Sequence, residues 1–97
     1  MKLSPEDLSF VVRSIRRYFP KEEFQLKLFG SYATGTARPA SDIDIAVIGA
    51  GPIPAGAWQA LEGELEESDF PKKVDIVDYH RVSGEFQRII DRDGILI

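Results

Sequence analysis

The chain has 97 residues, enough for one domain of modest core size, and its 43% hydrophobic and 29% charged residues exclude general disorder. The net charge of −4 argues against a general nucleic-acid binder, because such proteins usually present a basic surface. With no cysteine and a single histidine, His80, the chain cannot build a thiolate or multi-histidine zinc site, so a bound metal would need carboxylate ligands, as magnesium does.

The first residues predict a helix and no targeting signal. Ser4 is suited to cap this helix, and Pro5 fits its first turn. Pro20 ends the helical pattern. No segment reaches the roughly 20 apolar residues of a membrane span, so we expect a cytoplasmic protein without membrane contact. The apolar residues at helical spacing are Leu8, Val11, Val12, Ile15 and Phe19.

The rest of the chain alternates predicted strands with predicted helices. The predicted strands are residues 24–28, 43–47, 74–77 and 95–97. The predicted helices are residues 57–67 and residues 83–91, with Ser83 as the cap of the second. A short helical turn is expected near Ser31, inside the Gly- and Ser-containing loop 30–41. The order α-β-α-β-α-β-α-β predicts a single α/β domain over residues 1–97, with helices packed on a sheet.

A candidate phosphate-binding turn follows the first predicted strand. Gly30 would let a phosphate approach the backbone closely, and the helix start after it offers free N–H groups and the positive end of a dipole. The hydroxyl of Ser31 adds a further donor. The alternative is a plain turn in which serine caps the helix, which is the common use of this dipeptide.

The second predicted strand begins with two aspartates. Residues two apart on a strand share a face, so Asp42 and Asp44 would project together while Ile43 points into the core. Two adjacent carboxylates repel each other unless a cation lies between them, which indicates a divalent ion. The alternative is an exposed strand face with no ligand.

A third acid lies in the third predicted strand. Asp75 is flanked by β-branched residues, where an unpaired carboxylate is costly to bury. If this strand lies beside the strand of Asp44, three carboxylates could hold two metal ions about 3.5–4 Å apart. Asp78 is the competing choice, disfavoured because it falls near the strand end, and an edge-strand aspartate without function is the alternative to both.

The segment 30–47, GSYATGTARPASDIDIAV, resembles the extended first motif of the minimal nucleotidyltransferases, members of the DNA polymerase beta-like nucleotidyltransferase superfamily. That superfamily has Gly-Ser, a short spacer, Asp-x-Asp in a strand and an acid in a later strand. Residues 89–97 also look like the helix-turn-strand at the end of this family. The resemblance implies a nucleotidyltransferase fold with a mixed sheet of about four strands instead of an all-parallel one.

By this resemblance, Gly30 and Ser31 bind the triphosphate of ATP. The implied ligands of two magnesium ions are Asp42, Asp44 and Asp75. Arg38 stands where the family carries a basic loop residue, so it is a candidate phosphate contact or else a solvated loop charge. The extended first motif is specific to the family, whereas the third-acid motif is weaker.

The resemblance also implies a partner and an activity. Minimal nucleotidyltransferases typically act as antitoxins that transfer AMP to a tyrosine of a HEPN-domain toxin (higher eukaryotes and prokaryotes nucleotide-binding), in pairs of the type VII kind. We therefore expect a protein adenylyltransferase that forms a hetero-oligomer or homo-oligomer and does not act on nucleic acid. The alternative is a nucleotide-binding or catalytically weak module that neutralises its partner by contact alone.

Overall fold

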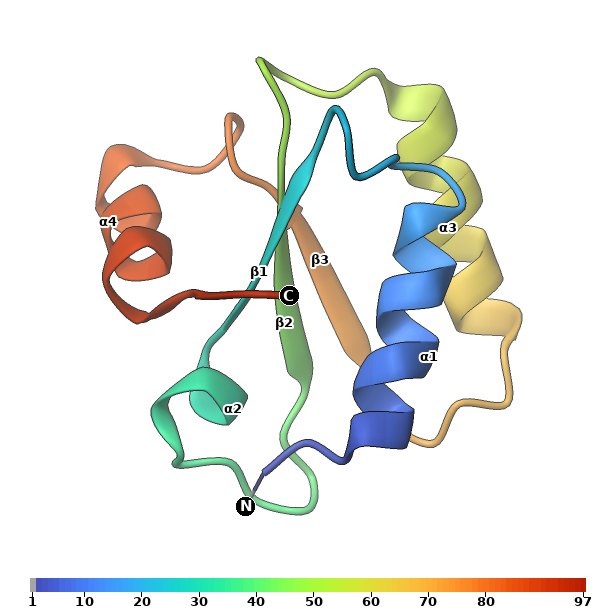
Figure 1. The fold of residues 1–97 in the computed structure, drawn as a ribbon, viewed down its shortest axis with the longest axis vertical. Coiled ribbons are helices and arrows are strands. Elements are labelled where there is room, and N and C mark those ends of the chain that lie inside the picture. Colours follow the sequence, from blue (N-terminus) through green and yellow to red (C-terminus); the bar gives the residue numbers. More distant parts are fainter. Residues whose placement is uncertain (1) are drawn as a thin grey trace.

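The computed structural model describes residues 2–97, which form helices and strands in the predicted alternation (Figure 1). The helices are α1 (Pro5–Arg16), α2 (Ser31–Thr34), α3 (Ala55–Glu67) and α4 (Gly84–Asp93). The strands are β1 (Gln25–Phe29), β2 (Ile43–Ile48), β3 (Val74–Asp78) and β4 (Ile95–Leu96). All the predicted elements are present. Of the helices in residues 2–97, none combines the length and apolar character that a membrane crossing requires.

Helix α1 begins as predicted and ends earlier than predicted. The hydroxyl of Ser4 accepts the N–H of Asp7 at 3.1 Å, which caps the first turn. The helix stops at Arg16, so the prediction that Phe19 belongs to it was wrong. Phe19 immediately precedes Pro20, and a residue in that position is sterically pushed away from helical geometry. Phe19 is nevertheless 1% exposed, because the turn after α1 carries it into the core.

The four strands form one sheet in the order β3-β2-β1-β4. Strand β1 runs antiparallel to both β2 and β4, whereas β2 and β3 are parallel. The sheet is therefore mixed, which confirms the fold that the family resemblance implies. Strands β3 and β4 are its two edges.

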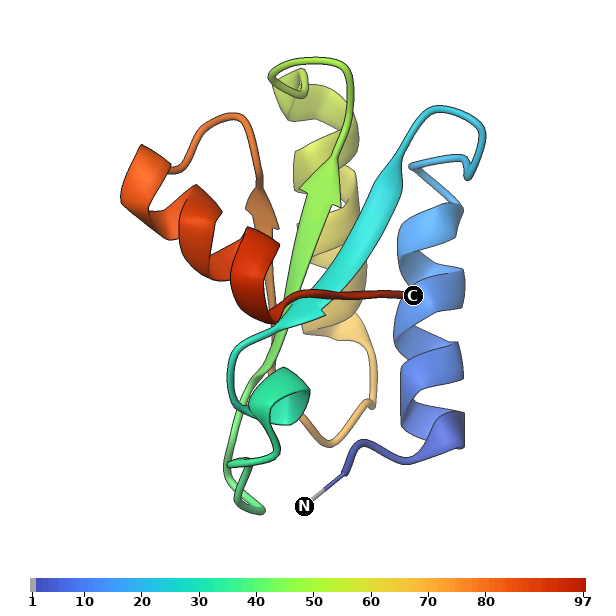
Figure 2. The same ribbon diagram turned by 60° about the vertical axis from the view of Figure 1, so that its left-hand side comes forward.

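Helices cover the two faces of the sheet unequally. Figures 1 and 2 show α1 and α3 together on one face and α4 on the other, with the single turn of α2 below α4 in the view of Figure 1. The larger core lies under α1 and α3, and Val11, Ile15 and Leu61 in it are fully buried. A smaller cluster under α4 contains Ile90 and Phe29.

Strand β2 separates these two clusters by the alternation of its side chains. Ile43, Ile45 and Val47 are fully buried in the larger core. Ala46 packs in the smaller cluster instead, so Asp44, two residues earlier, lies on the same face as Ala46. Asp44 is only partly buried. The inward direction predicted for Ile43 and Ile45 is confirmed, and it fixes the outward direction of Asp44.

Candidate functional site

Gly30 joins β1 to α2 in a backbone conformation that residues with a side chain rarely adopt, with φ of +72°. A Cβ atom at this position would collide with the carboxylate of Asp44. The loop backbone therefore lies directly against this acid, an approach that only glycine permits. A ligand bound beside this contact would reach both the backbone of the loop and the carboxylate of Asp44.

Helix α2 begins directly after Gly30 and consists of one turn. The N–H groups of Ala33 and Thr34 donate to the carbonyl oxygen of Gly30 at 3.0 and 3.1 Å, which holds the turn closed. Gly35 ends it with φ of +80°. The helical turn predicted near Ser31 is thus confirmed. The first amides of any helix have no partners within it, so the backbone at Ser31 is arranged as in sites that accept anions.

Asp44 and Asp75 are register partners on the parallel strands β2 and β3. Val74 and Ile76, the neighbours of Asp75, pack against the larger core under α1 and α3. Asp75 therefore projects to the opposite face, which is also the face of Asp44. The structure thus places the third predicted acid directly beside Asp44, which the sequence alone left open.

The three acids form one electrostatic group. Burial raises the pKa of Asp44 from 3.8 to about 6, and repulsion from Asp75 and then from Asp42 adds to this rise. Asp42 lies one residue before β2 and is partly exposed. The charged form of Asp44 is consequently disfavoured, and a cation close to it would relieve the repulsion.

Lys73 supplies a partial countercharge at this site. Its Nζ lies 3.7 Å from Oδ1 of Asp75, and it also lowers the pKa of Asp44. The Lys73 side chain is 71% exposed, so the ion pair contributes little to stability. The pair leaves the carboxylate of Asp75 reachable from solvent, at 43% exposure.

The donor set fits a hard divalent cation, although its members are not gathered into a closed metal site. Within residues 2–97, no three or more carboxylate or imidazole side chains converge closely enough to hold a metal ion. Asp42, Asp44 and Asp75 offer only oxygen ligands, which magnesium prefers. Their mutual repulsion, seen in the raised pKa of Asp44, is the feature that a cation would offset.

Asp78 makes buried structural contacts and does not belong to the group of Asp42, Asp44 and Asp75. It is 7% exposed, and its Oδ2 accepts the N–H of Ile53 at 2.8 Å and pairs with Arg81 at 3.3 Å. Its Oδ1 accepts the N–H of His80 at 3.0 Å. Asp78 therefore ties the loop before α3 to the end of β3. These contacts engage both of its oxygens and support the choice of Asp75 as the third acid of the site.

Arg38 lies in the exposed loop between α2 and β2. Its N–H donates to the hydroxyl of Ser41 at 2.8 Å, and the N–H of Ser41 donates to the carbonyl of Arg38 at 2.9 Å. This turn fixes the backbone and leaves the guanidinium without an ion-pair partner among residues 2–97. The geometry suits a phosphate contact and equally a solvated charge.

His80 and Trp58 make structural contacts. Nε2 of His80 donates to the carbonyl of Gly49 at 2.8 Å, which places the ring in a loop contact. Trp58 packs its ring edge-to-face on Phe19, with 6.0 Å between centroids, as a partly buried member of the larger core. These contacts give both side chains a structural role.

Two lysines at the site were missed by the sequence interpretation. Lys73 pairs with Asp75, and Nζ of Lys72 lies 5.8 Å from the centroid of the Tyr32 ring in α2. Both come from the segment directly before β3, so the Lys-Lys pair preceding the strand acid was the available signal. The hydroxyl of Tyr32 is buried without a hydrogen-bond partner among residues 2–97.

The glycine turn, the one-turn helix and the paired strand acids on a mixed sheet are the parts of a nucleotidyltransferase site. The family described as polymerase beta, nucleotidyltransferase matches residues 14–97. The chain belongs to this family and is a nucleotidyltransferase.

Individual relatives agree with this assignment. The chain is 30% identical to a Haemophilus influenzae protein described as "Probable protein adenylyltransferase MntA", over 100% of this chain and 83% of the relative. A crystal structure of a toxin–antitoxin with AMP-PNP matches 97% of this chain and 72% of its own, with 31% identity and a TM-score of 0.74. The structure of the MNT antitoxin with tri-AMPylated Shewanella oneidensis HEPN toxin matches 94% of this chain and 68% of its own, with 27% identity and a TM-score of 0.63.

Proposed function

We propose that the chain is a magnesium-dependent enzyme that transfers AMP from ATP to a protein. The observation that supports this most directly is the register pairing of Asp44 with Asp75 beside the backbone of Gly30. The proposed ligands of two magnesium ions are Asp42, Asp44 and Asp75. The proposed nucleotide contacts are Gly30, Ser31 and Arg38.

Some side chains act on ATP, the AMP donor, and others act on the hydroxyl that accepts the AMP. When bound, the divalent ions would neutralise charge on the triphosphate and its departing pyrophosphate. The backbone at Gly30 admits the phosphates close to Asp44, and the hydroxyl of Ser31 donates to a phosphate oxygen. The acceptor oxygen bonds to the α-phosphorus as the bond to pyrophosphate breaks. The exposed carboxylate of Asp75 takes the proton of the acceptor hydroxyl.

The acceptor we infer is a tyrosine of a HEPN-domain toxin, with the chain acting in the cytoplasm as its antitoxin in a type VII-like pair. Two relatives support this proposal. One is described as a protein adenylyltransferase, and another antitoxin was solved with a tri-AMPylated HEPN toxin.

The test uses ATP labelled in the α-phosphate, magnesium chloride and the candidate toxin. Label is expected on a toxin tyrosine, located by mass spectrometry, and only with the metal present. The matched control is Asp42→Asn with Asp44→Asn, which keeps the size of both side chains and should abolish labelling. A wild-type chain that transfers no label to the toxin it inhibits would refute the proposed reaction.

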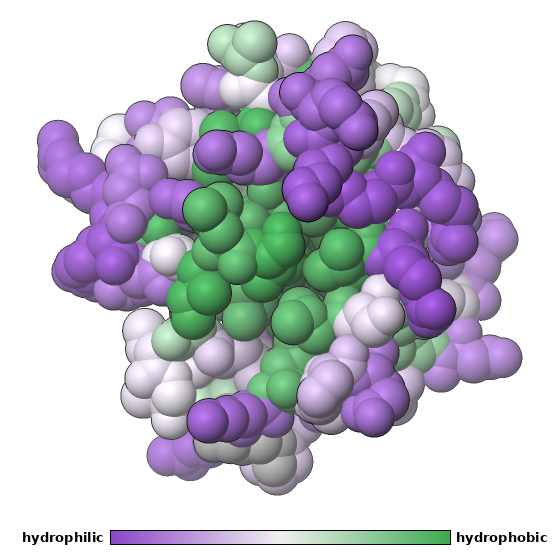
Figure 3. Space-filling model, viewed as in Figure 1, coloured by the Kyte–Doolittle hydropathy of each residue, from purple (hydrophilic) through white to green (hydrophobic). Residues whose placement is uncertain are grey.

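Neutralisation by contact alone is the second candidate, and one observation favours it. Figure 3 shows a continuous apolar surface over β4 between α1 and α4. Ile95 and Leu96 in β4 are 48% and 62% exposed, and β4 is the sheet edge opposite β3, which carries Asp75. Contact alone predicts that the double asparagine variant still inhibits the toxin, whereas the enzymatic proposal predicts that it does not.

A further inference from the structure

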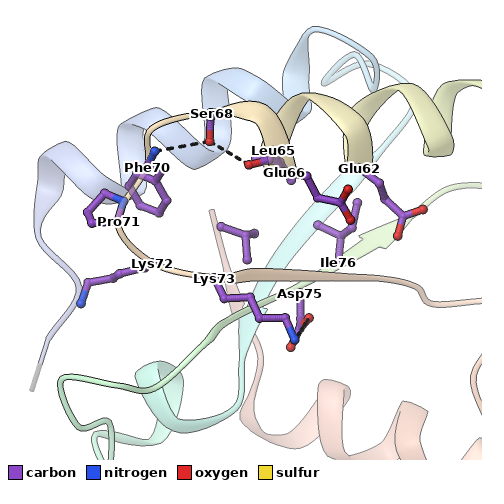
Figure 4. A pocket seen from close by; sticks show the side chains of 11 residues that line it. Glu62, Leu65, Glu66, Ser68, Phe70, Pro71, Lys72, Lys73, Asp75 and Ile76 are labelled. Atoms are coloured by element: carbon purple, nitrogen blue, oxygen red, sulfur yellow. Dashed lines mark hydrogen bonds and ion pairs between the residues drawn. The ribbon is translucent and has the colours of Figure 1, made fainter.

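A cavity of about 380 Å³ lies between α3 and the edge strand β3, next to the acids of the site. Its apolar lining includes Leu65 of α3 and Ile76 of β3, and Phe70 closes one end (Figure 4). Glu62 and Glu66 project from α3 above it, and Asp75 lies on the opposite side of the β3 ribbon from Ile76. Asp75 is therefore shared between the cavity and the acidic group.

The position of this cavity fits the acceptor side of the transfer. In the proposed reaction the leaving pyrophosphate lies towards Gly30 and Ser31, which adjoin Asp44 from the β1 side. An in-line displacement requires the attacking oxygen to arrive from the opposite side. That side is β3, the free edge of the sheet, where Asp75 and the cavity lie.

We propose that this cavity seats the acceptor residue, a tyrosine in a polypeptide segment with basic neighbours. This inference rests on the proposed function, since it assigns the side of the site from which the acceptor enters. The phenol ring covers the apolar lining formed by Leu65 and Ile76, and its hydroxyl reaches Asp75 at the rim. The volume lies within the 300–1,000 Å³ typical of ligand pockets.

Charge complementarity indicates the neighbours of that tyrosine. Glu62 and Glu66 are one helical turn apart, so they lie on the same face of α3. Both are exposed, and neither has an ion-pair partner among residues 2–97. Lys72 and Lys73 also line the cavity, on the β3 side, whereas the two unpaired carboxylates lie on the α3 side. On that side they attract arginine or lysine side chains that flank the ring. An acidic acceptor segment would be repelled there.

The experiment compares the double variant Glu62→Lys/Glu66→Lys with a matched control. The control is Glu22→Lys with Glu23→Lys, an exposed acidic pair before β1 that changes the net charge equally. The substrates are the peptides Ala-Arg-Ala-Tyr-Ala-Arg-Ala and Ala-Glu-Ala-Tyr-Ala-Glu-Ala, with labelled ATP and magnesium. Peptide KM, the Kd of AMP-PNP and the thermal midpoint are measured for each variant.

We expect the wild-type chain to prefer the basic peptide. The Glu62/Glu66 variant should raise the KM for that peptide on the order of tenfold, as expected for two exposed charge pairs turned repulsive. Its Kd for AMP-PNP should not change, and the control variant should behave as wild type. An unchanged peptide KM overturns the proposal, and a weakened AMP-PNP affinity shows that the cavity holds the nucleotide instead.

A binding measurement separates this inference from the proposed function. Amide NMR shifts are recorded while the basic peptide is added to the full chain with AMP-PNP and magnesium. Shifts centred on Leu65, Phe70 and Ile76 support the acceptor cavity even if no label is transferred. Transfer of label together with shifts confined to other surfaces refutes the cavity and leaves the enzymatic proposal standing.

Discussion

Asp44 and Asp75 stand opposite each other in register on β2 and β3, and both project to the sheet face away from α1 and α3. Each occupies a strand position where a β-branched or aromatic residue would stabilise the sheet better. The pair therefore costs stability in the absence of a cation. Measurements of the free energy of unfolding therefore report on the site independently of enzymatic activity.

The first prediction concerns Asp44→Asn and pH. The pKa of Asp44 in the folded chain is about 6, above its usual 3.8, so the folded state binds the proton more tightly than the unfolded state. The resulting stability is fully present below about pH 4 and is lost as pH rises through 6. Asparagine does not titrate, so the variant should gain about 1–2 kcal/mol relative to wild type at pH 7.5, a figure reduced for solvent screening.

Urea denaturation at pH 4 and pH 7.5 in metal-free buffer provides the measurement. The difference in unfolding free energy between the two proteins should be small at pH 4 and should grow at pH 7.5. Asp7→Asn, in the first turn of α1 and away from the three acids of the site, is the control. A wild-type chain at least as stable as Asp44→Asn at pH 7.5 contradicts the electrostatic description.

The second prediction concerns magnesium. A ligand that binds only the folded state stabilises it by about 2.7 kcal/mol at one hundred times its Kd. Magnesium chloride should therefore raise the thermal midpoint of the wild-type chain, and the rise should increase with AMP-PNP. Asp44→Asn and Asp75→Asn should each lose most of it. If Asp75→Asn keeps the full rise, the third metal ligand is a different residue.

The third prediction compares two glycines with similar backbone angles. Gly30 and Gly35 both have positive φ, so alanine at either position is strained by about 1 kcal/mol. At Gly35 the added methyl group meets open space, whereas at Gly30 it collides with the carboxylate of Asp44. Gly30→Ala should therefore be the less stable variant and should weaken AMP-PNP binding at least tenfold. Gly35→Ala should bind AMP-PNP normally.

Calorimetric titration of AMP-PNP with magnesium, together with urea denaturation, checks both glycine variants. Equal AMP-PNP affinity in Gly30→Ala and Gly35→Ala would show that the close approach of the loop to Asp44 has no part in nucleotide binding.

Much of the fold was predictable because the sequence patterns that indicate it are local. The alternation of Ile43 and Ile45 with aspartates gave the direction of every side chain in β2, and Ser4 and Ser83 gave two helix starts. The register of Asp75 with Asp44 was not predictable, since it depends on pairing between strands some thirty residues apart. The resemblance of residues 30–47 to a known family, and not periodicity, predicted that the sheet is mixed, and the order of its strands was not predicted.

The remaining features of the site depend on contacts that no local pattern contains. From the sequence alone Lys73 would be expected to be a solvated charge. Only the strand geometry brings its Nζ beside Asp75. Asp78 reads as an equivalent of Asp75, because both follow a valine in the same strand. The hydrogen bond from the N–H of Ile53, 25 residues away, is what distinguishes them.

The fourth prediction tests that distinction with Asp78→Asn. Asparagine keeps one acceptor oxygen but loses the charge that pairs with Arg81, and its NH₂ group meets the N–H of Ile53 or of His80. Hydrogen bonds to a buried charged group are worth about 1.5–3 kcal/mol, so the variant should lose about 2 kcal/mol of unfolding free energy. Asp75→Asn should not be destabilised in metal-free buffer, because it removes a repulsive charge beside Asp44.

In the rate of AMP transfer to the toxin, the two variants should rank in the opposite order. Below its melting temperature, Asp78→Asn should keep its magnesium-dependent thermal shift and label the toxin at a rate within about threefold of wild type, since Asp78 faces the loop before α3. Asp75→Asn should lose about a hundredfold or more, as expected when a general base is removed. If folded Asp78→Asn transfers no label while Asp75→Asn stays active, the roles assigned to the two acids are wrong. Stability and catalysis would then both depend on the carboxylate of Asp78.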